Sequence, residues 1–299
     1  MKMTVSVAAS APRANRSIGA ILMDSGVLSP EDAERILLFQ KEHGLRFGEA
    51  AIRLGLLSEA DIQFALSRQF SYAYLRTMGD KKPLSDELVA AYQPFSPRVE
   101  QLRAIRSQLM LRWFDKAEQR QVLTVVGTEP GEGRSYLAVN LAVVFSQLGE
   151  RTLLIDADMR RPRQHELFLL QNKVGLSTVL SGRSRDEAII RITDLAGLFV
   201  LPAGPVPPNP LELLSRLNFD EFLIHVRASF DMVIIDTPAL STGEDAAMIS
   251  VRTGAALAVA RNGQTRVASF NDMVQGLMNA GVAVVGSVLN EVPLKKAAK

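Results

Sequence analysis

Residues 128–135 (TEPGEGRS) form a glycine-rich loop between an apolar run at 122–127 and a helical pattern that begins at 135. A loop in this position points successive backbone N–H groups inward, and the N-terminus of the following helix adds partial positive charge. Together they predict a phosphate-binding site. We expect the Ser135 hydroxyl to ligate Mg²⁺ and a nucleotide to contact the loop and the start of the helix: Gly131, Glu132, Gly133, Arg134, Ser135 and Tyr136.

From residue 121 onward, short apolar runs alternate with helical patterns. Strand–helix alternation with β-branched strands predicts an α/β fold, a doubly wound and mostly parallel sheet of the P-loop NTPase type. Its ligand is expected at the carboxyl ends of the strands. The expected strands are Val122–Gly127, Thr152–Asp156, Leu198–Leu201, Met232–Asp236, Ala255–Ala260 and Val282–Leu289, and the clearest helices are 135–148, 210–229 and 265–280.

Two of these strands end in carboxylates. Asp156 ends one strand, Asp158 follows two positions later, and Asp236 ends another. Because the carboxyl ends of parallel strands meet at one edge of the sheet, these side chains are expected beside Ser135. Mg²⁺ takes few protein carboxylates and otherwise binds phosphate oxygens and water. The pattern therefore predicts Mg²⁺ ligands at Ser135, Asp158 and Asp236.

Residues 17–69 contain an internal repeat with a period of 29 positions. Each copy is predicted to form a short helix, a glycine turn, an N-cap serine and a second helix with acidic residues in its first turn. Two such hairpins can bury their apolar faces against each other, so we expect a small all-α domain at residues 15–75. The matching positions are Gly19, Gly26, Ser29, Asp32 and Gln40 in the first copy and Gly48, Gly55, Ser58, Asp61 and Gln69 in the second.

The repeat resembles the N-terminal domain of type II secretion and type IV pilus ATPases, in the variant that binds cyclic di-GMP. This resemblance implies a cyclic di-GMP site, in which glycines admit the flat ligand and arginine stacks on guanine and pairs with phosphate. The chain departs from the motif at Ser17, where arginine is expected. The alternative is that the glycines only make turns and the domain docks a partner. The implicated residues are Arg16, Gly19, Gln40, Arg46, Gly48 and Gln69.

Composition and the remaining segments set further expectations. Residues 1–14 are expected to be a flexible N-terminus, and residues 76–98, with three prolines and a charge cluster, a linker to the nucleotide-binding domain at 99–299. The chain has no cysteine, which excludes disulfides and zinc–thiolate sites. A formal charge of only +2 does not predict a nucleic-acid partner. No apolar run approaches the ~20 residues that span a bilayer, so we expect a cytoplasmic protein that reaches the membrane through a partner.

Three stretches are similar to the bacterial tyrosine kinases of capsule and exopolysaccharide systems. Residues 158–168 (DMRRPRQHELF) are similar to the stretch after that family's second aspartate strand, and residues 204–214 to its proline-rich turn and helix. Residues 100–106 match its Glu-x-x-Arg-x-x-Arg oligomerisation motif, whose spacing places Glu100, Arg103 and Arg106 along one helix face. With the P-loop and the aspartate strands, the resemblance covers residues 97–291.

The resemblance implies ATP and Mg²⁺ as cofactors. It implies that Asp156 is the base toward a tyrosine hydroxyl, that Arg134 stands at the place of the catalytic P-loop lysine, and that Asn290 lies where related ATPases recognise adenine. It also implies a homo-oligomer, in which an arginine from a neighbouring subunit can stabilise phosphoryl transfer. The implied partner is a membrane-anchored polysaccharide chain-length regulator at the inner membrane.

The chain departs from the family in two places. Arg134 replaces lysine, and because guanidinium is wider and prefers planar pairing, we expect nucleotide to bind through backbone N–H groups and Mg²⁺ with weakened catalysis. The tyrosine-rich C-terminal tail is missing. The sequence leaves open an active kinase, a nucleotide-gated switch, a positioning ATPase of the partition or septum-site class, and a cyclic di-GMP receptor with a vestigial ATP site.

Overall fold

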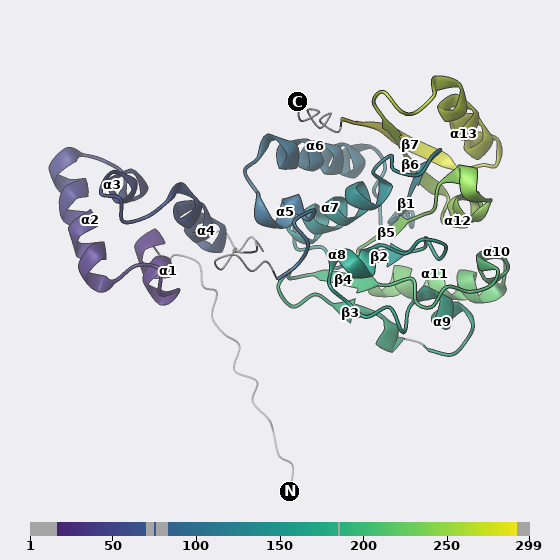
Figure 1. The fold of residues 1–299 in the computed structure, drawn as a ribbon, viewed down its shortest axis with the longest axis horizontal. Helices are drawn as coiled ribbons and strands as arrows, with labels where there is room; N and C mark the ends of the chain where they lie inside the picture. The colour runs from purple at the N-terminus through teal and green to yellow at the C-terminus, as the bar shows by residue number, and fades with distance from the viewer. Residues whose placement is uncertain (1–16, 70–74, 76–82, 185, 292–299) are drawn as a thin grey trace, which may run out of the picture. The chain divides into compact units, whose positions relative to one another are not determined.

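The structure is a computed structural model that describes residues 17–69, 75, 83–184 and 186–291 (Figure 1). The chain divides into two compact units, Met1–Tyr74 and Leu75–Lys299. The flexible segment expected at residues 1–14 lies outside the described residues.

The first unit is helical and follows the sequence repeat. Its helices are α1 (Ile18–Asp24), α2 (Pro30–His43), α3 (Phe47–Arg53) and α4 (Glu59–Gln69). Ser29 accepts a hydrogen bond from the N–H of Asp32 at 3.0 Å, and Ser58 accepts one from the N–H of Asp61 at 3.3 Å, so the two N-caps are equivalent. The core consists of Leu22, Leu28, Ala33, Ile36, Ala50, Ala51, Leu57 and Ala65.

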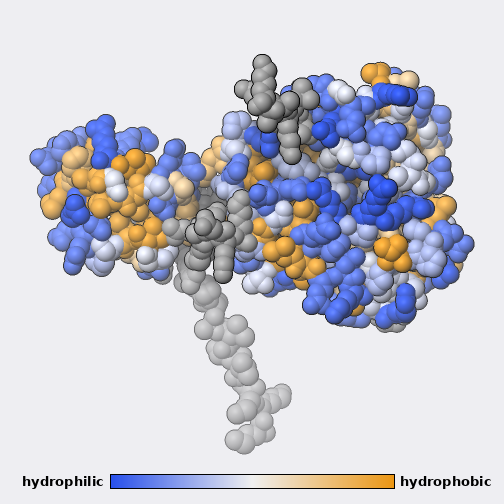
Figure 2. Space-filling model, viewed as in Figure 1, coloured by the Kyte–Doolittle hydropathy of each residue, from blue (hydrophilic) through white to orange (hydrophobic). Residues whose placement is uncertain are grey.

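Apolar side chains also reach the surface of this unit. Figure 2 shows hydrophobic residues gathered on its visible face. Leu37 and Leu38 of α2 are among its exposed large apolar side chains, with 55% and 66% of their surface accessible. A unit of this size has too little interior to bury all of its apolar residues.

The second unit is a seven-stranded sheet with the order β3-β4-β2-β5-β1-β6-β7. All neighbouring strands are parallel except β3, which is antiparallel to β4. The predicted doubly wound, mostly parallel P-loop fold is therefore confirmed, with β3 as a two-residue edge strand that the sequence analysis missed. The strands are β1 (Val122–Gly127), β2 (Thr152–Asp156), β3 (Ile190–Arg191), β4 (Leu198–Leu201), β5 (Met232–Asp236), β6 (Ala255–Arg261) and β7 (Ala283–Asn290).

Helices cover both faces of this sheet, because alternate residues of a strand point to opposite faces. Leu123, Leu154 and Ile234 share a core with one group of helices: α5 (Val89–Tyr92), α6 (Pro97–Arg112), α7 (Arg134–Ser146) and α8 (Gln164–Leu167). Leu153 and Ile235 point the other way. The helices on that side are α9 (Leu176–Leu180), α10 (Pro210–Leu214), α11 (Leu217–Ser229), α12 (Asp245–Thr253) and α13 (Val267–Asn279), with short 3₁₀ turns at Asp186–Ala188 and Leu240–Thr242.

Helix α7 follows the glycine-rich loop and is the central helix of the unit (Figure 1). It is apolar on nearly all sides and buried along most of its length, as expected of a helix that lies between a sheet and other helices. It packs against β1, β2 and β5, whose carboxyl ends form the expected ligand edge.

The linker expected at residues 76–98 is wrong for residues 83–98. Leu88 and Ala90 are fully buried in the core beside α7. Asn140 of α7 accepts a hydrogen bond from the N–H of Ala90 at 3.0 Å and donates one to the carbonyl of Glu87 at 2.9 Å. The prolines and charges of this segment suggested a solvated linker, but its leucines and alanines complete the core of the α/β unit. Residues 76–82 lie outside the described residues.

Candidate nucleotide-binding site

The loop between β1 and α7 depends on two glycines with left-handed backbone conformations. Gly131 has φ of 83° and Gly133 has φ of 95°, which other residues adopt only with strain. A side chain at Gly133 would also overlap the amide of Asn290. The sequence therefore folds here into the tight loop that its glycine spacing predicts.

Three side chains from the β6–β7 region bind three successive carbonyls of this loop. Gln264 donates to the carbonyl of Pro130 at 3.1 Å, Arg261 to that of Gly131 at 3.0 Å, and Asn290 to that of Glu132 at 3.0 Å. We call Arg261, Gln264 and Asn290 the carbonyl clamp. In a trans peptide the N–H points opposite to the C=O, so the clamp turns the next N–H groups toward the other side of the loop, where an anion can accept them.

Arg134 lies inside the loop. Its Nε donates to the carbonyl of Thr237 at 3.1 Å, and its Nη1 donates to the carbonyl of Glu129 at 2.7 Å. Only 8% of its surface is exposed. Its guanidinium therefore links the loop to the end of β5, although Arg134 was predicted among the nucleotide contacts, at the place of the P-loop lysine.

Glu132 is also internal. Its carboxylate is fully buried, and Oε1 accepts hydrogen bonds from Thr128 Oγ1 at 2.7 Å and Thr265 Oγ1 at 2.5 Å. Its Oε2 lies 3.6 Å from Nη1 of Arg134 and has no hydrogen-bond partner among the described residues. Glu132 can therefore meet a nucleotide only through its backbone.

Asp156 and Asp236 are direct neighbours at the ends of β2 and β5, and both are fully buried. Asp156 accepts hydrogen bonds from the N–H groups of Arg163 at 2.9 Å and Gln164 at 2.8 Å. Burial, with the negative charge of Asp236 adding to it, raises the pKa of the Asp156 carboxyl well above its ordinary value. The fold thus confines two carboxyl groups in a space that disfavours their joint ionisation.

The two carboxylate oxygens of Asp236 differ in their surroundings. Its Oδ2 accepts a hydrogen bond from Gln164 Nε2 at 2.8 Å, while its Oδ1 has no partner among the described residues. Burial raises the pKa of Asp236 to about 6, although hydrogen bonds from Gln164 and Ser135 and the charge of Arg134 oppose the rise. A buried carboxylate oxygen without a partner, next to a serine hydroxyl, fits the ligand set of Mg²⁺.

Gln164 is a site residue that sequence reasoning missed. It is fully buried, and its Nε2 donates both to Asp236 and to the carbonyl of Ser135, at 3.2 Å, so it joins β5 to the start of α7. Its Oε1 has no partner among the described residues. The sequence showed only that a polar residue lies eight positions after Asp156, which does not distinguish a buried position from a surface one.

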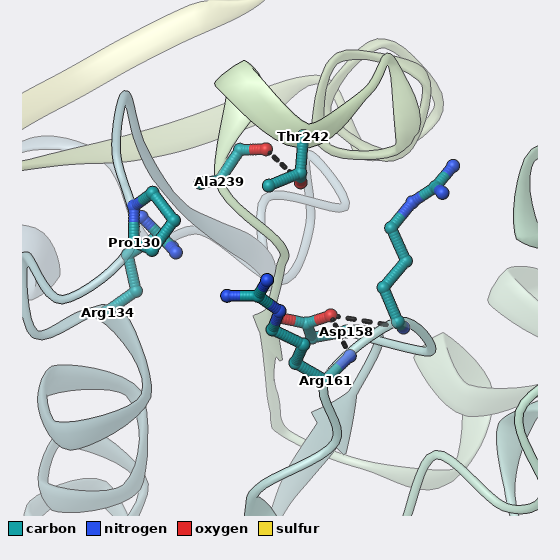
Figure 3. Close-up of a pocket in the computed structure, with 7 residues that line it drawn as sticks. Pro130, Arg134, Asp158, Arg161, Ala239 and Thr242 are labelled. Carbon is teal, nitrogen blue, oxygen red and sulfur yellow. Dashed lines mark hydrogen bonds between the residues drawn. The ribbon is translucent and has the colours of Figure 1, made fainter.

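Asp158 borders a pocket of about 280 Å³ at this edge of the sheet (Figure 3). Its Oδ1 accepts hydrogen bonds from the N–H groups of Arg160 at 3.1 Å and Arg161 at 2.8 Å, which fixes the turn after β2. The pocket is lined by Pro130, Arg134, Asp158, Arg160, Arg161, Ala239 and Thr242.

Two further residues predicted to contact the nucleotide, Tyr136 and Asn290, interact with other parts of the protein. Tyr136 is half-buried and packs against the core that surrounds α7, and burial raises the pKa of its hydroxyl. Asn290, expected at the adenine, is part of the carbonyl clamp. Both lie next to the loop, and neither position by itself assigns a nucleotide contact.

The three residues of the predicted oligomerisation motif lie on α6. Glu100 and Arg103 form an ion pair within the helix. Arg106 donates to the carbonyl of Val144 at 2.7 Å, near the end of α7 that is farther from Ser135. The motif therefore lies away from the glycine-rich loop of its own chain.

The residues implicated in cyclic di-GMP binding divide into packed and exposed ones. A Cβ on Gly19 would lie 3.2 Å from the ring of Phe47, and one on Gly48 would lie 3.1 Å from Ile62, so both glycines permit close packing. Arg46 is exposed at the start of α3, while Gln40 and Gln69 are half-buried. Arg16 lies outside the described residues.

The part of the chain that the structure describes has neither a membrane-spanning helix nor a cluster of metal-ligating side chains. None of the helices there is both long and apolar enough to cross a membrane. No group of three or more His, Cys, Asp or Glu side chains there could hold a metal ion. A Mg²⁺ ion at Asp236 would thus depend on the Ser135 hydroxyl and on phosphate oxygens as well.

Comparison with known proteins gives a consistent set of relatives. An AAA domain family matches residues 120–253. The chain is 36% identical to tyrosine-protein kinase YwqD of Bacillus subtilis, over 70% of this chain and 87% of YwqD. It is 33% identical to tyrosine-protein kinase wzc of Salmonella typhimurium, over 72% of this chain but only 30% of wzc. The solved kinase domain of Escherichia coli tyrosine kinase ETK is 32% identical, with a TM-score of 0.66, over 75% of this chain and 87% of that domain.

Proposed function

This chain belongs to the bacterial tyrosine-protein kinase family, and on that premise we propose that it is an ATP-binding, tyrosine-kinase-type regulator of exopolysaccharide chain length and export. The family implies ATP and Mg²⁺ as cofactors. The observation that carries the proposal is the buried pair of Asp156 and Asp236, which ends two adjacent strands beside Ser135 and the glycine-rich loop.

The residues at this edge suit separate tasks. We assign Ser135, Asp158 and Asp236 to Mg²⁺, because Asp236 Oδ1 is buried without a partner among the described residues. Mg²⁺ would neutralise charge on the phosphate oxygens. Asp156 is the proposed base toward a tyrosine hydroxyl, and its raised pKa favours proton uptake. The N–H groups turned inward by the carbonyl clamp would bind the phosphates, and Asn290 the adenine.

Catalysis is proposed to be weak in the isolated chain. A P-loop lysine would offer a compact charge to the outer phosphates, whereas Arg134 is occupied by the carbonyls of Glu129 and Thr237. We propose that a membrane-anchored chain-length regulator binds the chain at the inner membrane and raises its activity, and that α6 joins subunits into a homo-oligomer.

Calorimetry with purified protein tests the nucleotide site. Mg-ATP and Mg-ADP are expected to bind and to raise the melting temperature. Asp236→Ala should weaken the part of nucleotide binding that depends on Mg²⁺. Glu221→Gln, an exposed carboxyl change on α11, is the matched control and should bind as the unaltered protein does. A melting temperature that does not change at millimolar nucleotide would exclude a working site.

Product analysis separates the enzyme from its alternatives. Phosphotyrosine formed on a partner or on the chain itself supports a kinase. ATP consumption without phosphotyrosine supports a positioning ATPase, and binding without consumption supports a nucleotide-gated switch.

We propose that residues 15–75 form a secretion-ATPase-like domain that binds cyclic di-GMP. The specific observation that favours this is the exposed Arg46 at the start of α3, in a unit built from two equivalent helix pairs. Arg46→Ala in the full chain should weaken binding by about one to two decades, because a charge-assisted contact contributes roughly 1.5–3 kcal/mol. Arg53→Ala, an exposed change on the same helix, is the control. Absence of binding to the unaltered chain would leave a docking domain or a structural one.

A further inference from the structure

Three arginines line the pocket beside Asp158: Arg134, Arg160 and Arg161. A nucleotide at the glycine-rich loop would place its outer phosphates here, and those phosphates need a side-chain cation. The three arginines differ in how far their guanidinium groups are already engaged.

Arg134 is engaged inside the protein. It satisfies the carbonyls of Glu129 and Thr237 and is the cation nearest to the buried carboxylate of Glu132. Turning it toward a phosphate would leave both carbonyls without this donor and Glu132 without a counter-charge, and buried polar groups without partners are costly.

Arg160 is engaged by the carboxylate of Asp245 on α12. Its Nε donates to Oδ2 of Asp245 at 2.7 Å, and its Nη2 lies 3.4 Å from Oδ1 of the same carboxylate. Asp245 is only 1% exposed, so removing its arginine would leave a buried charge unpaired. Arg160 therefore positions α12 against the turn after β2.

Arg161 has neither constraint. Its backbone N–H is held by Asp158 at 2.8 Å, which fixes where the side chain starts. Its guanidinium forms no hydrogen bond or ion pair within the described residues. In Figure 3 its side chain extends toward the side of the pocket where Pro130 and Arg134 lie.

We propose that Arg161, and not Arg134, is the side-chain cation that pairs with the outer phosphates of the bound nucleotide, while Arg134 serves as an internal brace of the loop. This inference rests on the proposed nucleotide site. Guanidinium presents parallel N–H donors that match phosphate oxygens, so an arginine held at its backbone by Asp158 can replace the missing lysine from the opposite wall of the pocket.

Calorimetric titration of the full chain with Mg-ATP, Mg-ADP and AMP tests the role of Arg161. Arg161→Gln should weaken binding of ATP and ADP at least tenfold and leave AMP unchanged, since AMP lacks the outer phosphates. Arg161→Lys should recover part of the loss because it keeps the charge. Arg191→Gln, an exposed arginine on the edge strand β3, is the matched control and should bind all three ligands normally.

Melting of the protein without nucleotide tests the role of Arg134. Arg134→Gln should lower the melting temperature by several degrees, whereas Arg161→Gln should not change it. If Arg134→Gln does not fold, Arg134→Lys replaces it. In the Arg134→Lys background a lysine can reach the phosphates. Arg161→Gln should therefore reduce the affinity for ATP less in that background than in the unaltered protein.

The outcomes distinguish this inference from the function on which it rests. Normal ATP binding by Arg161→Gln, with normal binding by the unaltered protein, would overturn the role of Arg161 and leave the nucleotide site intact. If Arg161→Gln reduced ATP affinity equally in the unaltered protein and in the Arg134→Lys variant, the division of roles between the two arginines would be overturned. No nucleotide binding by the unaltered protein would overturn the inference and the proposed function together.

Discussion

Arg134 stabilises the folded protein through its hydrogen bonds to two carbonyls, so its replacement by lysine should affect stability as well as catalysis. Arg134→Lys is expected to lower the free energy of unfolding by about 1–2 kcal/mol, because one flexible ammonium cannot satisfy both carbonyls. The same change should raise ATP turnover if arginine is the limiting defect. Urea unfolding and phosphotyrosine formation measure the two effects, and an unchanged or lower rate would show that the site is adapted to arginine.

Asp236 gives the molecule a pH dependence. Burial raises its pKa to about 6, from an ordinary value of 3.8. Between these pH values the folded state binds more protons than the unfolded state, so this carboxyl lowers the free energy of unfolding as the pH rises through the window. Without Mg²⁺, Asp236→Asn is expected to stabilise the protein at pH 7.5 by about 1–3 kcal/mol, and the gain should shrink toward pH 5.

Unfolding of Asp236→Asn and the unaltered protein at pH 5, 6 and 7.5 checks this expectation. Mg²⁺-dependent nucleotide binding should be lost in the variant at every pH, since the amide removes the anionic ligand. If Asp236→Asn were less stable than the unaltered protein at pH 7.5, or if its gain in stability grew as the pH fell, the raised pKa of Asp236 would be contradicted.

At the scale of elements, the carbonyl clamp shows how β6 and β7 prepare a loop that lies between β1 and α7. Gln264→Ala and Asn290→Ala each remove one hydrogen bond of roughly 0.5–1.5 kcal/mol and free the loop to adopt other conformations. Each variant should therefore bind nucleotide several-fold more weakly with nearly normal secondary structure. Asn262→Ala, an exposed change in the same connection, is the control, and equal losses in all three variants would argue against the clamp.

Helix α6 carries the prediction about assembly. Arg103 pairs with Glu100 within the helix, while Arg106 also supports α7 through the carbonyl of Val144. Arg103→Glu is therefore the cleaner test and is expected to shift an oligomer toward monomer in light scattering with ATP present. Arg112→Glu, an exposed change at the end of the same helix, should not. An unaltered protein that is monomeric with ATP would contradict the prediction.

At the scale of the whole molecule, the segment at 83–98 decides where the α/β unit begins. A chain that starts at residue 83 should fold and bind nucleotide, whereas one that starts at 99 loses Leu84, Leu88 and Val89 from the core. The shorter fragment is expected to have a free energy of unfolding lower by on the order of 5 kcal/mol, since burial of a Leu or Val side chain contributes about 1.5–3 kcal/mol. Circular dichroism melting of the two fragments measures it, and equal stability would return the segment to the role of a linker.

Much of the fold could be predicted from local sequence, because β-strands and P-loops have short-range signatures. The ends of β1, β2, β4 and β5 agree with the expected strands. Strand β3 was missed because Ile190 and Arg191 are too few to show a period and pair only through their contact with β4. The roles of the individual site residues stay predictions.

Local patterns also predicted Ser135, Asp156 and Asp236 at one edge of the sheet. Each strand and the carboxylate at its end can be recognised along the chain, and the carboxyl ends of parallel strands meet at the same edge. The surroundings of each group depended on tertiary contacts. Gln264 and Asn290 reach the glycine-rich loop from more than 130 residues away in sequence. The turn of Arg134 into the interior, the burial of Gln164 and the docking of 83–98 arise in the same way, because hydrogen bonding and burial depend on neighbours in space, and those neighbours exist only once distant segments pack together.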